Sequence, residues 1–260
     1  MSSFIWYELM TSDPDAASAF YGAVIGWKVP PPAPGGQDYR MLVRGDGGNA
    51  GGMMKILPDM AAAGCRPAWM PYLHVADVAA AAAAIGAAGG QVLVPPTRIP
   101  QGTFAMLNDP QGVPIYIMDP VPPPGMEDYR SDVFARDGAA QRVAWNELAS
   151  PDLAGSKAFY AGQFGFEFNE TMNMGEMGDY CFIDQDGERQ GAMMQRADER
   201  QPAMWLPYFR VGVLEPARAA IEAGGGTVLM GPHEVPGGEW IVVAMDPQGA
   251  GFGLVAKQKD

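Results

Sequence analysis

Alternation of side-chain type along the chain predicts a first strand, and helical spacing follows it. Residues 4–10 alternate in side-chain type around Trp6 and Glu8, as expected for a strand whose two faces differ. Asp13 then precedes Pro14, an arrangement that typically begins a helix, because aspartate caps the first turn and proline fits it. Apolar residues recur at helical spacing over the next two to three turns. The chain is therefore expected to begin with a strand followed by a helix.

The same order of elements then returns. A strand and an alanine-rich helix, which Asp77 can cap, follow a loop expected at residues 58–68. We expect each half of the chain to read β-α-β-β-β twice. The expected strands are 4–10, 39–43, 51–57, 70–76, 91–94, 103–108, 114–118, 143–149 and 207–212, with more before residues 195 and 256, and the later expected helices are 78–88, 152–163 and 215–223.

Five sequence blocks occur twice in one order, which indicates an internal duplication. The matched blocks are WYELMTSDPDAASAFYGAVIGW (6–27) with WNELASPDLAGSKAFYAGQFGF (145–166), GGMMK (51–55) with GAMMQ (191–195), WMPYLHV (69–75) with WLPYFRV (205–211), IGAAGGQVLVPP (85–96) with IEAGGGTVLMGP (221–232), and NDPQG (108–112) with MDPQG (245–249). A proline-rich and then polar segment separates the copies. We expect two domains, at 1–122 and 141–260, joined by a linker at 123–140.

Charge and composition narrow the possible partners. The formal net charge is -13, so nucleic acids and anionic membranes are not expected as partners. The amino-terminal stretch lacks the basic region of a signal peptide, and no apolar run approaches the roughly 18 residues of a membrane span. Cys65 and Cys181 do not form a disulfide framework, and His233 is expected in a solvated Gly/Pro-rich loop. We expect a cytoplasmic monomer or homodimer.

The repeated unit resembles the vicinal oxygen chelate superfamily, which includes glyoxalase I, bleomycin-resistance proteins and extradiol dioxygenases. The resemblance rests on the S-D-P start of the helix (12–14), the Phe-Tyr and Gly-Trp pairs within 20–27, and the D-P-x-G block (109–112). The W-x-E-L and W-x-P-Y blocks are similar to those of tandem glyoxalase-like bacterial proteins. The resemblance implies an α+β fold with four β-α-β-β-β modules, paired into two glyoxalase-like domains with cup-shaped sheets.

The resemblance also implies where a metal would bind. Metal-using members place His, Gln or Glu at facing positions of the cup. Here these positions carry Trp6, Met53–Met54, Met70 and Tyr116 in the first copy, and Trp145, Met193–Met194, Leu206 and Gly253 in the second. Divalent ions prefer imidazole and carboxylate ligands, so we expect no metal and no cofactor in either cup.

Strand alternation selects the other residues of each cup. Glu8 shares a face with Trp6, and Tyr72 and His74 share one with Met70. Apolar cavities with a few convergent polar groups are typical small-molecule sites. The candidate catalytic residues are Glu8 and His74, and the candidate ligand-binding residues are Trp6, Met54, Met70, Tyr72, Tyr116, Trp145, Glu147, Tyr208 and Arg210.

Structural roles for these side chains remain open. Arg210 could neutralise Glu147 in an ion pair, the tryptophans could be core residues, and His74 could be a polar residue without chemistry. The first cup is therefore preferred for proton transfer, although Gly253 leaves room for a ligand in the second.

Two classes of function follow. The first is a binding protein or metal-independent enzyme, of lyase or proton-transfer type, for a largely apolar or aromatic metabolite. One alternative is a metal-dependent lyase or dioxygenase in which Glu8 and His74 supply displaced ligands. The others are a non-catalytic binding or resistance protein, and a non-catalytic partner protein whose cups are merely packed.

Overall fold

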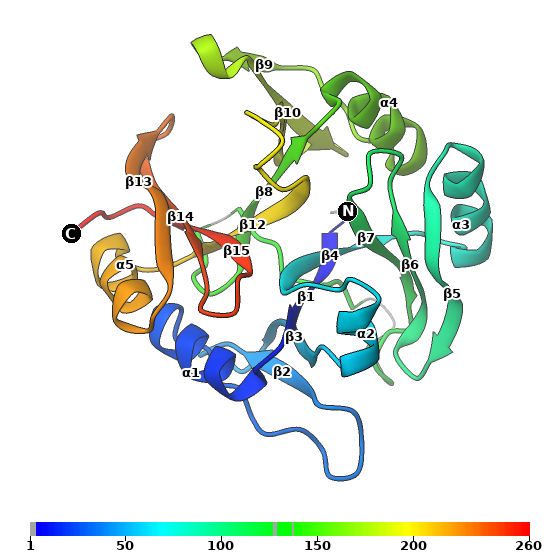
Figure 1. Ribbon diagram of the computed structural model, residues 1–260, viewed down its shortest axis with the longest axis horizontal. Helices are drawn as coiled ribbons and strands as arrows, with labels where there is room; N and C mark the ends of the chain where they lie inside the picture. Colours follow the sequence, from blue (N-terminus) through cyan, green and yellow to red (C-terminus); the bar gives the residue numbers. More distant parts are fainter. Residues whose placement is uncertain (1–3, 127–128, 137) are drawn as a thin grey trace. The chain divides into compact units, whose positions relative to one another are not determined.

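The computed structural model describes residues 4–126, 129–136 and 138–260 (Figure 1). The fold is α+β, as expected. Strands β1 to β7, which come from the first half of the chain, form one curled sheet, and strands β8 to β15 form a second. The duplication in the sequence therefore produces two sheets of related strand order.

The described residues also divide into two compact units, and each unit draws on both copies of the repeat. The first unit comprises residues 4–5, 70–131 and 146–205, and the second comprises residues 6–69, 132–145 and 206–260. Each unit thus contains one β-α-β-β-β module from each half of the chain. The expected domain limits at residues 122 and 141 stay a prediction.

The first unit holds two groups of strands, each with its own helix. Strands β4, β7, β6 and β5 lie in that order, and β8, β11, β10 and β9 form the other group. The elements are β4 (Ala68–His74), α3 (Val78–Ala87), β5 (Gln91–Ile99), β6 (Gly102–Asn108), β7 (Pro114–Pro120), β8 (Val143–Ser150), α4 (Leu153–Phe164), β9 (Thr171–Asn173), the 3-10 helix η1 (Gly175–Met177), β10 (Asp179–Gln185) and β11 (Glu188–Gln195).

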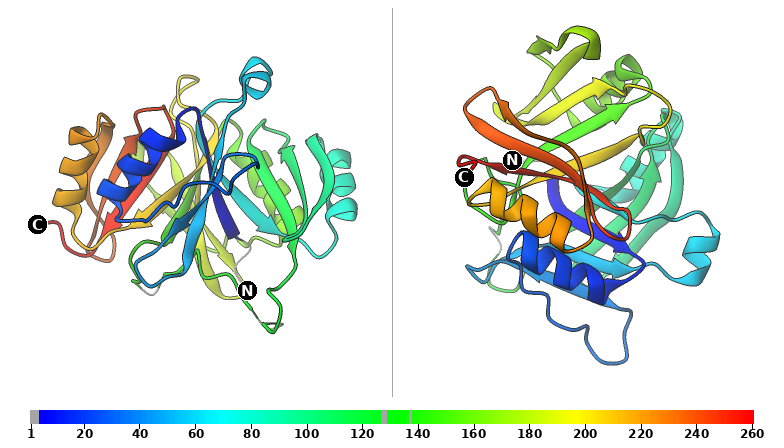
Figure 2. Two further views of the ribbon diagram at one scale, coloured as in Figure 1. Left: turned by 90° about the horizontal axis from the view of Figure 1, so that it is seen from below. Right: turned by 60° about the vertical axis from the view of Figure 1, so that its left-hand side comes forward.

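The second unit has the corresponding groups, with strand orders β2-β3-β1 and β12-β15-β14-β13. Its elements are β1 (Phe4–Thr11), α1 (Pro14–Val24), β2 (Tyr39–Val43), β3 (Asn49–Lys55), α2 (Pro58–Ala62), β12 (Met204–Arg210), α5 (Leu214–Ala223), β13 (Thr227–Val235), β14 (Glu239–Met245) and β15 (Gly251–Ala256). Helices α1 and α5 pack against each other, as the views in Figures 1 and 2 show.

A buried hydrogen-bond network anchors the second unit. Trp69 Nε1 donates to Tyr21 Oη at 2.9 Å, and Tyr21 Oη donates to Asp246 Oδ2 at 3.0 Å. Burial and the negative charge of Asp246 raise the pKa of Tyr21, so the phenol keeps its proton. The tyrosine comes from one copy of the repeat and the aspartate from the other.

The first unit repeats this network with the copies exchanged. Trp205 Nε1 donates to Tyr160 Oη at 2.9 Å, and Tyr160 is hydrogen-bonded to Asp109. Asp109 also accepts from the backbone N–H groups of Gln111 and Val113, so it holds the turn that follows it. The Phe-Tyr and Asp-Pro motifs therefore build the core.

Most predicted elements are confirmed, including both predicted caps. Asp13 accepts from the backbone N–H of Ala16, and Asp77 accepts from the N–H groups of Ala79 and Ala80. Part of the loop expected at 58–68 is instead the short helix α2.

Two segments differ more clearly from the sequence prediction. Strand β5 continues past its two prolines to Ile99, because register shifts between Val92 and Thr97 let the pairing with β6 resume. His233 is exposed, as expected, but it lies within β13 and pairs with Ile241, so the expectation of a loop is wrong.

Candidate functional site

Glu8 is a buried carboxylate in the middle of β1. Glu8 is only 3% exposed. The side chain of Tyr39, from β2, forms a hydrogen bond with the Glu8 carboxylate. Trp6 Nε1 donates to Tyr39 Oη at 3.0 Å, which leaves the phenol proton for Glu8. Burial and then the charge of Glu8 raise the pKa of Tyr39, so this tyrosine is a proton-bearing donor at neutral pH.

Gly52 makes this arrangement possible. It lies opposite Glu8 on β3, and a Cβ atom placed there would be 2.0 Å from Tyr39 Oη. Only a residue without a side chain lets the Tyr39 ring cross β3 toward Glu8. Met54, a predicted ligand-binding residue, also lies on β3, where it is half-buried and pairs with Tyr39 of β2.

The second copy of the repeat contains the same tyrosine–glutamate pair, formed by Tyr180 and Glu147, and both residues belong to the first unit. Tyr180 Oη donates to Glu147 Oε2 at 2.7 Å. Tyr180 lies opposite Met194 on β11, as Tyr39 lies opposite Met54 on β3. Glu147 is half-buried, so it is less shielded from water than Glu8.

Neither tyrosine stands out in the sequence pattern. The signal that could have found them is an Asp-Tyr pair that occurs in each copy, at 38–39 and at 179–180, at the start of a strand. The segments before the two pairs, residues 28–37 and 167–178, have dissimilar sequences, so neither pair belongs to the five matched blocks.

Tyr72 and Tyr116 form a stacked aromatic pair in the first unit. They lie opposite each other on the parallel strands β4 and β7, with ring centroids 4.2 Å apart and planes at 11°. Met70 is buried on the same strand, and His74 is half-buried opposite Met118. Trp6 and Glu8 belong to the second unit, so the predicted cooperation of Glu8 with His74 stays a prediction.

The room expected at Gly253 is filled. A Cβ atom on Gly253 would lie 2.2 Å from Tyr208 Cδ1, because the two residues face each other on β15 and β12. Tyr208 packs in a hydrophobic cluster with Trp145 and Leu206. The expectation that a ligand could enter beside Gly253 is therefore wrong, since the tyrosine ring occupies that space.

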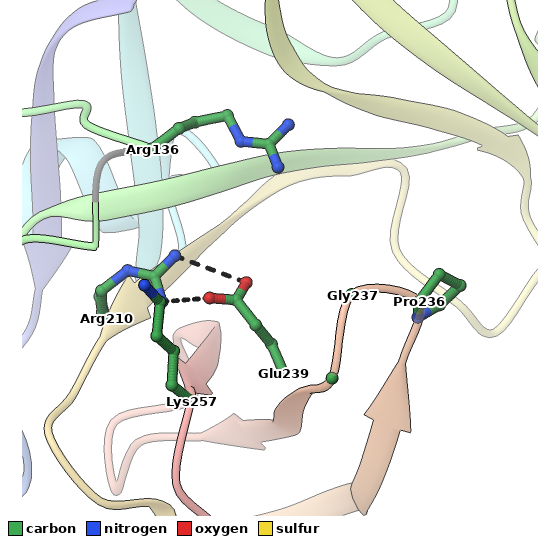
Figure 3. A pocket seen from close by; sticks show the side chains of 7 residues that line it. Arg136, Arg210, Pro236, Gly237, Glu239 and Lys257 are labelled. Carbon is green, nitrogen blue, oxygen red and sulfur yellow. Dashed lines mark hydrogen bonds and ion pairs between the residues drawn. The ribbon is translucent and has the colours of Figure 1, made fainter.

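Arg210 has an ion-pair partner that the sequence did not suggest. Its Nη1 and Nη2 atoms lie 2.5 Å and 3.5 Å from the carboxylate oxygens of Glu239. Figure 3 shows this pair at a pocket of about 330 Å³. Glu147 and Arg210 belong to different units, so the predicted pair between them stays a prediction.

The donor set does not fit a divalent metal ion. The positions at which the resemblance implies ligands carry indole, thioether, phenol and aliphatic groups, or no side chain. Across residues 4–126, 129–136 and 138–260, no three His, Cys, Asp or Glu side chains gather in a group that could hold a metal. Such ions need several imidazole, carboxylate or thiolate ligands at about 2 Å.

Two family descriptions match the chain. "Glyoxalase-like domain" matches residues 6–118, and "Glyoxalase/Bleomycin resistance protein/Dioxygenase superfamily" matches residues 142–254. None of the described helices is long and apolar enough to cross a membrane.

Two curated relatives match parts of the chain. "Putative glyoxylase CFP32" of Mycobacterium tuberculosis is 42% identical over 122 residues, which is 46% of this chain and 45% of that protein. "Anthracycline biosynthesis protein DauV" of Streptomyces sp. (strain C5) is 30% identical over 128 residues, 44% of this chain and 46% of that protein. Each match spans less than half the length of the curated relative.

Solved structures share the fold at low sequence identity. The Mn(II)-bound glyoxalase from Novosphingobium aromaticivorans aligns with a TM-score of 0.66 and 16% identity, over 99% of this chain and 82% of its own. A mutant of homoprotocatechuate 2,3-dioxygenase from Brevibacterium fuscum aligns with a TM-score of 0.66 and 16% identity, over 99% and 72%. At such identity the likeness concerns the fold alone.

Proposed function

Because the chain belongs to the glyoxalase/bleomycin resistance protein/dioxygenase superfamily, with two such domains in tandem, we propose that it is a metal-independent enzyme of lyase or proton-transfer type. Its proposed substrate is a small, largely apolar or aromatic carbonyl compound. The observation that carries the proposal is the buried carboxylate of Glu8, bonded to Tyr39, which in turn accepts from Trp6.

The proposed role of Glu8 is that of a general base. Its carboxylate takes a proton from the carbon next to the substrate carbonyl, and the electron pair of the broken C–H bond moves to the carbonyl oxygen. The protonated Glu8 then returns the proton to the same or a neighbouring carbon, or a leaving group departs from the enolate. No electrons are gained or lost overall, so this reaction needs no redox cofactor.

Tyr39 and Trp6 are proposed as positioning residues for that base. Tyr39 keeps its proton at neutral pH and donates it to Glu8, which fixes the orientation of the carboxylate. The Trp6 N–H occupies a lone pair of the phenol oxygen and so directs the phenol proton toward Glu8. His74 is retained as a second proposed catalytic residue.

Aromatic side chains support the proposed substrate class. In the second unit, which holds Glu8, the partly buried ring of Trp145 packs against Tyr208. Methionine-rich strands adapt to ligands of varied shape. One relative is named for anthracycline biosynthesis, and anthracyclines are fused-ring aromatic compounds. Both points favour an aromatic ligand.

Proton exchange tests the proposal without knowledge of the natural substrate. Phenylacetone is incubated with the protein in deuterium oxide, with and without EDTA, and the loss of its α-proton signal is followed by NMR. We expect exchange above the buffer rate, a roughly 100-fold loss in Glu8→Gln, and a smaller loss in the matched control Glu147→Gln. Exchange that is equal in wild type and Glu8→Gln, or that EDTA abolishes, would contradict the proposal.

A non-catalytic protein whose cups are filled by its own side chains is the second candidate. The close packing of Tyr208 against Gly253 favours it, because that part of the second copy is filled by protein. Absence of both α-proton exchange and saturable phenylacetone binding would support this candidate against the first.

A further inference from the structure

Basic side chains gather at a pocket of the second unit, although the protein as a whole carries a net charge of -13. The charged residues described along the pocket of about 330 Å³ are Arg136, Arg210, Lys257 and Glu239. The basic residues therefore outnumber the acidic one. In Figure 3 the side chains of Arg210, Lys257 and Glu239 converge, and Arg136 extends above them.

Arg210 gives the pocket a buried donor. It is 5% exposed, and its Nε atom has no hydrogen-bond partner among the described residues. Its two terminal nitrogens engage Glu239, as described above. Buried N–H groups nearly always have an acceptor, so this N–H favours the arrival of an oxygen atom from outside the protein.

Arg136 and Lys257 add two basic side chains to the lining of the pocket. Both residues are exposed, and the Arg136 guanidinium lies 5.0 Å from the centre of the Trp145 ring. The guanidinium group is planar, which suits pairing with a planar carboxylate.

The turn at one side of the pocket combines Pro236 with two glycines. Gly237 and Gly238 both have positive φ angles, and a Cβ atom on either would meet nothing within 4 Å. Larger residues would be strained there, so the hairpin between β13 and β14 keeps a narrow edge beside the pocket.

We propose that this pocket binds a small organic carboxylate, with Arg136 and Lys257 attracting the anion and the Arg210 Nε donating to it. A cavity of this size holds far more than one ion, since a water molecule takes about 30 Å³ of liquid volume. Guanidinium groups pair with carboxylates through parallel N–H···O bonds. The site does not depend on Glu8 acting as a base.

Calorimetric titration with benzoate tests the proposal. Benzamide serves as a neutral probe of the same shape, and inorganic phosphate as an anion without a ring. We expect benzoate to bind the wild-type protein at millimolar or lower concentration and benzamide to bind at least about tenfold more weakly. Glu8→Gln should bind benzoate as the wild type does.

Variants of the exposed basic residues complete the test, because their loss leaves the Arg210–Glu239 pair intact. Arg136→Gln and Lys257→Gln should each weaken benzoate binding by about tenfold, with unchanged melting temperatures. Lys28→Gln removes one charge from an exposed residue that does not line the pocket, and it should bind as the wild type does.

Three results would overturn the proposal. The first is no saturable binding of benzoate, and the second is equal weakening by Lys28→Gln, which would indicate a general charge effect. The third is phosphate binding that matches benzoate and responds to the same variants, which would make the pocket a site for inorganic anions.

Discussion

The phenol of Tyr180 donates a 2.7 Å hydrogen bond to the carboxylate of Glu147, and Tyr39 forms the same kind of bond with Glu8 in the other copy of the repeat. The two pairs differ in their surroundings. Glu8 is buried and its tyrosine accepts from Trp6, whereas Glu147 is half-buried. Duplication therefore kept the tyrosine–carboxylate pair, while the shielding of the acid from water diverged.

That difference predicts unequal effects of removing the two phenols. Tyr39→Phe takes a donor from a carboxylate that water cannot easily reach, so it should lower the free energy of unfolding by about 1–3 kcal/mol. Tyr180→Phe should cost less, because water can replace the lost donor at Glu147. Urea unfolding of both variants at neutral pH measures the difference. Equal losses would show that burial of the acid does not set the effect.

Gly52 predicts a second change at the same place. Alanine at this position would bring Cβ to 2.0 Å from Tyr39 Oη, so the tyrosine must move away from Glu8. We expect Gly52→Ala to destabilise the protein by about 1–3 kcal/mol, as overpacking commonly does. Gly86→Ala is the control, since Gly86 lies in α3, a Cβ atom there would meet nothing within 4 Å, and alanine favours a helix by about 1 kcal/mol. If Gly52→Ala leaves the stability of the protein unchanged, the close packing of Tyr39 against Gly52 is contradicted.

An arginine–aspartate network in the second unit predicts acid sensitivity. Arg44 and Arg142 each lie within 3.1 Å of carboxylate oxygens of Asp46 and Asp132. The Gly48 N–H and then Arg44 lower the pKa of Asp46 to about 2, and hydrogen bonds from Arg142 and Arg44 outweigh burial to lower the pKa of Asp132.

Both acids have lower pKa values in the folded state than the usual 3.8, so the folded protein binds fewer protons than the unfolded chain in this range. Their stabilising contribution is complete above about pH 5, where the carboxyls are ionised in both states, and it is lost progressively as the pH falls through the lowered pKa values of the folded state. Asp132→Asn should therefore reduce the loss of stability between pH 4 and pH 2, measured by thermal unfolding. If the loss of stability at acidic pH is the same in Asp132→Asn as in the wild type, other carboxyl groups cause the acid sensitivity.

The helix starts and the repeated strands could be predicted because their signals are local. Asp13 and Asp77 cap helices through contacts within three residues, and the matched blocks reveal the duplication directly. The partner of Glu8 could not be predicted, because Tyr39 lies beyond a proline-rich stretch that does not align between the copies. Glu239 reaches Arg210 only through the pairing of three strands, so no sequence spacing indicates it.

Tyr208 and Gly253 provide the last prediction, because their contact depends on both residues. Gly253→Ala would place Cβ 2.2 Å from the Tyr208 ring, which should cost about 1–3 kcal/mol of stability. Tyr208→Ala removes a buried ring from a hydrophobic cluster and should cost about 3–5 kcal/mol. The double variant should be more stable than the sum of the two losses predicts, since alanine at 253 then has space to occupy. Chemical denaturation of the four proteins gives this coupling directly, and strictly additive losses would mean that the two residues do not compete for the same volume.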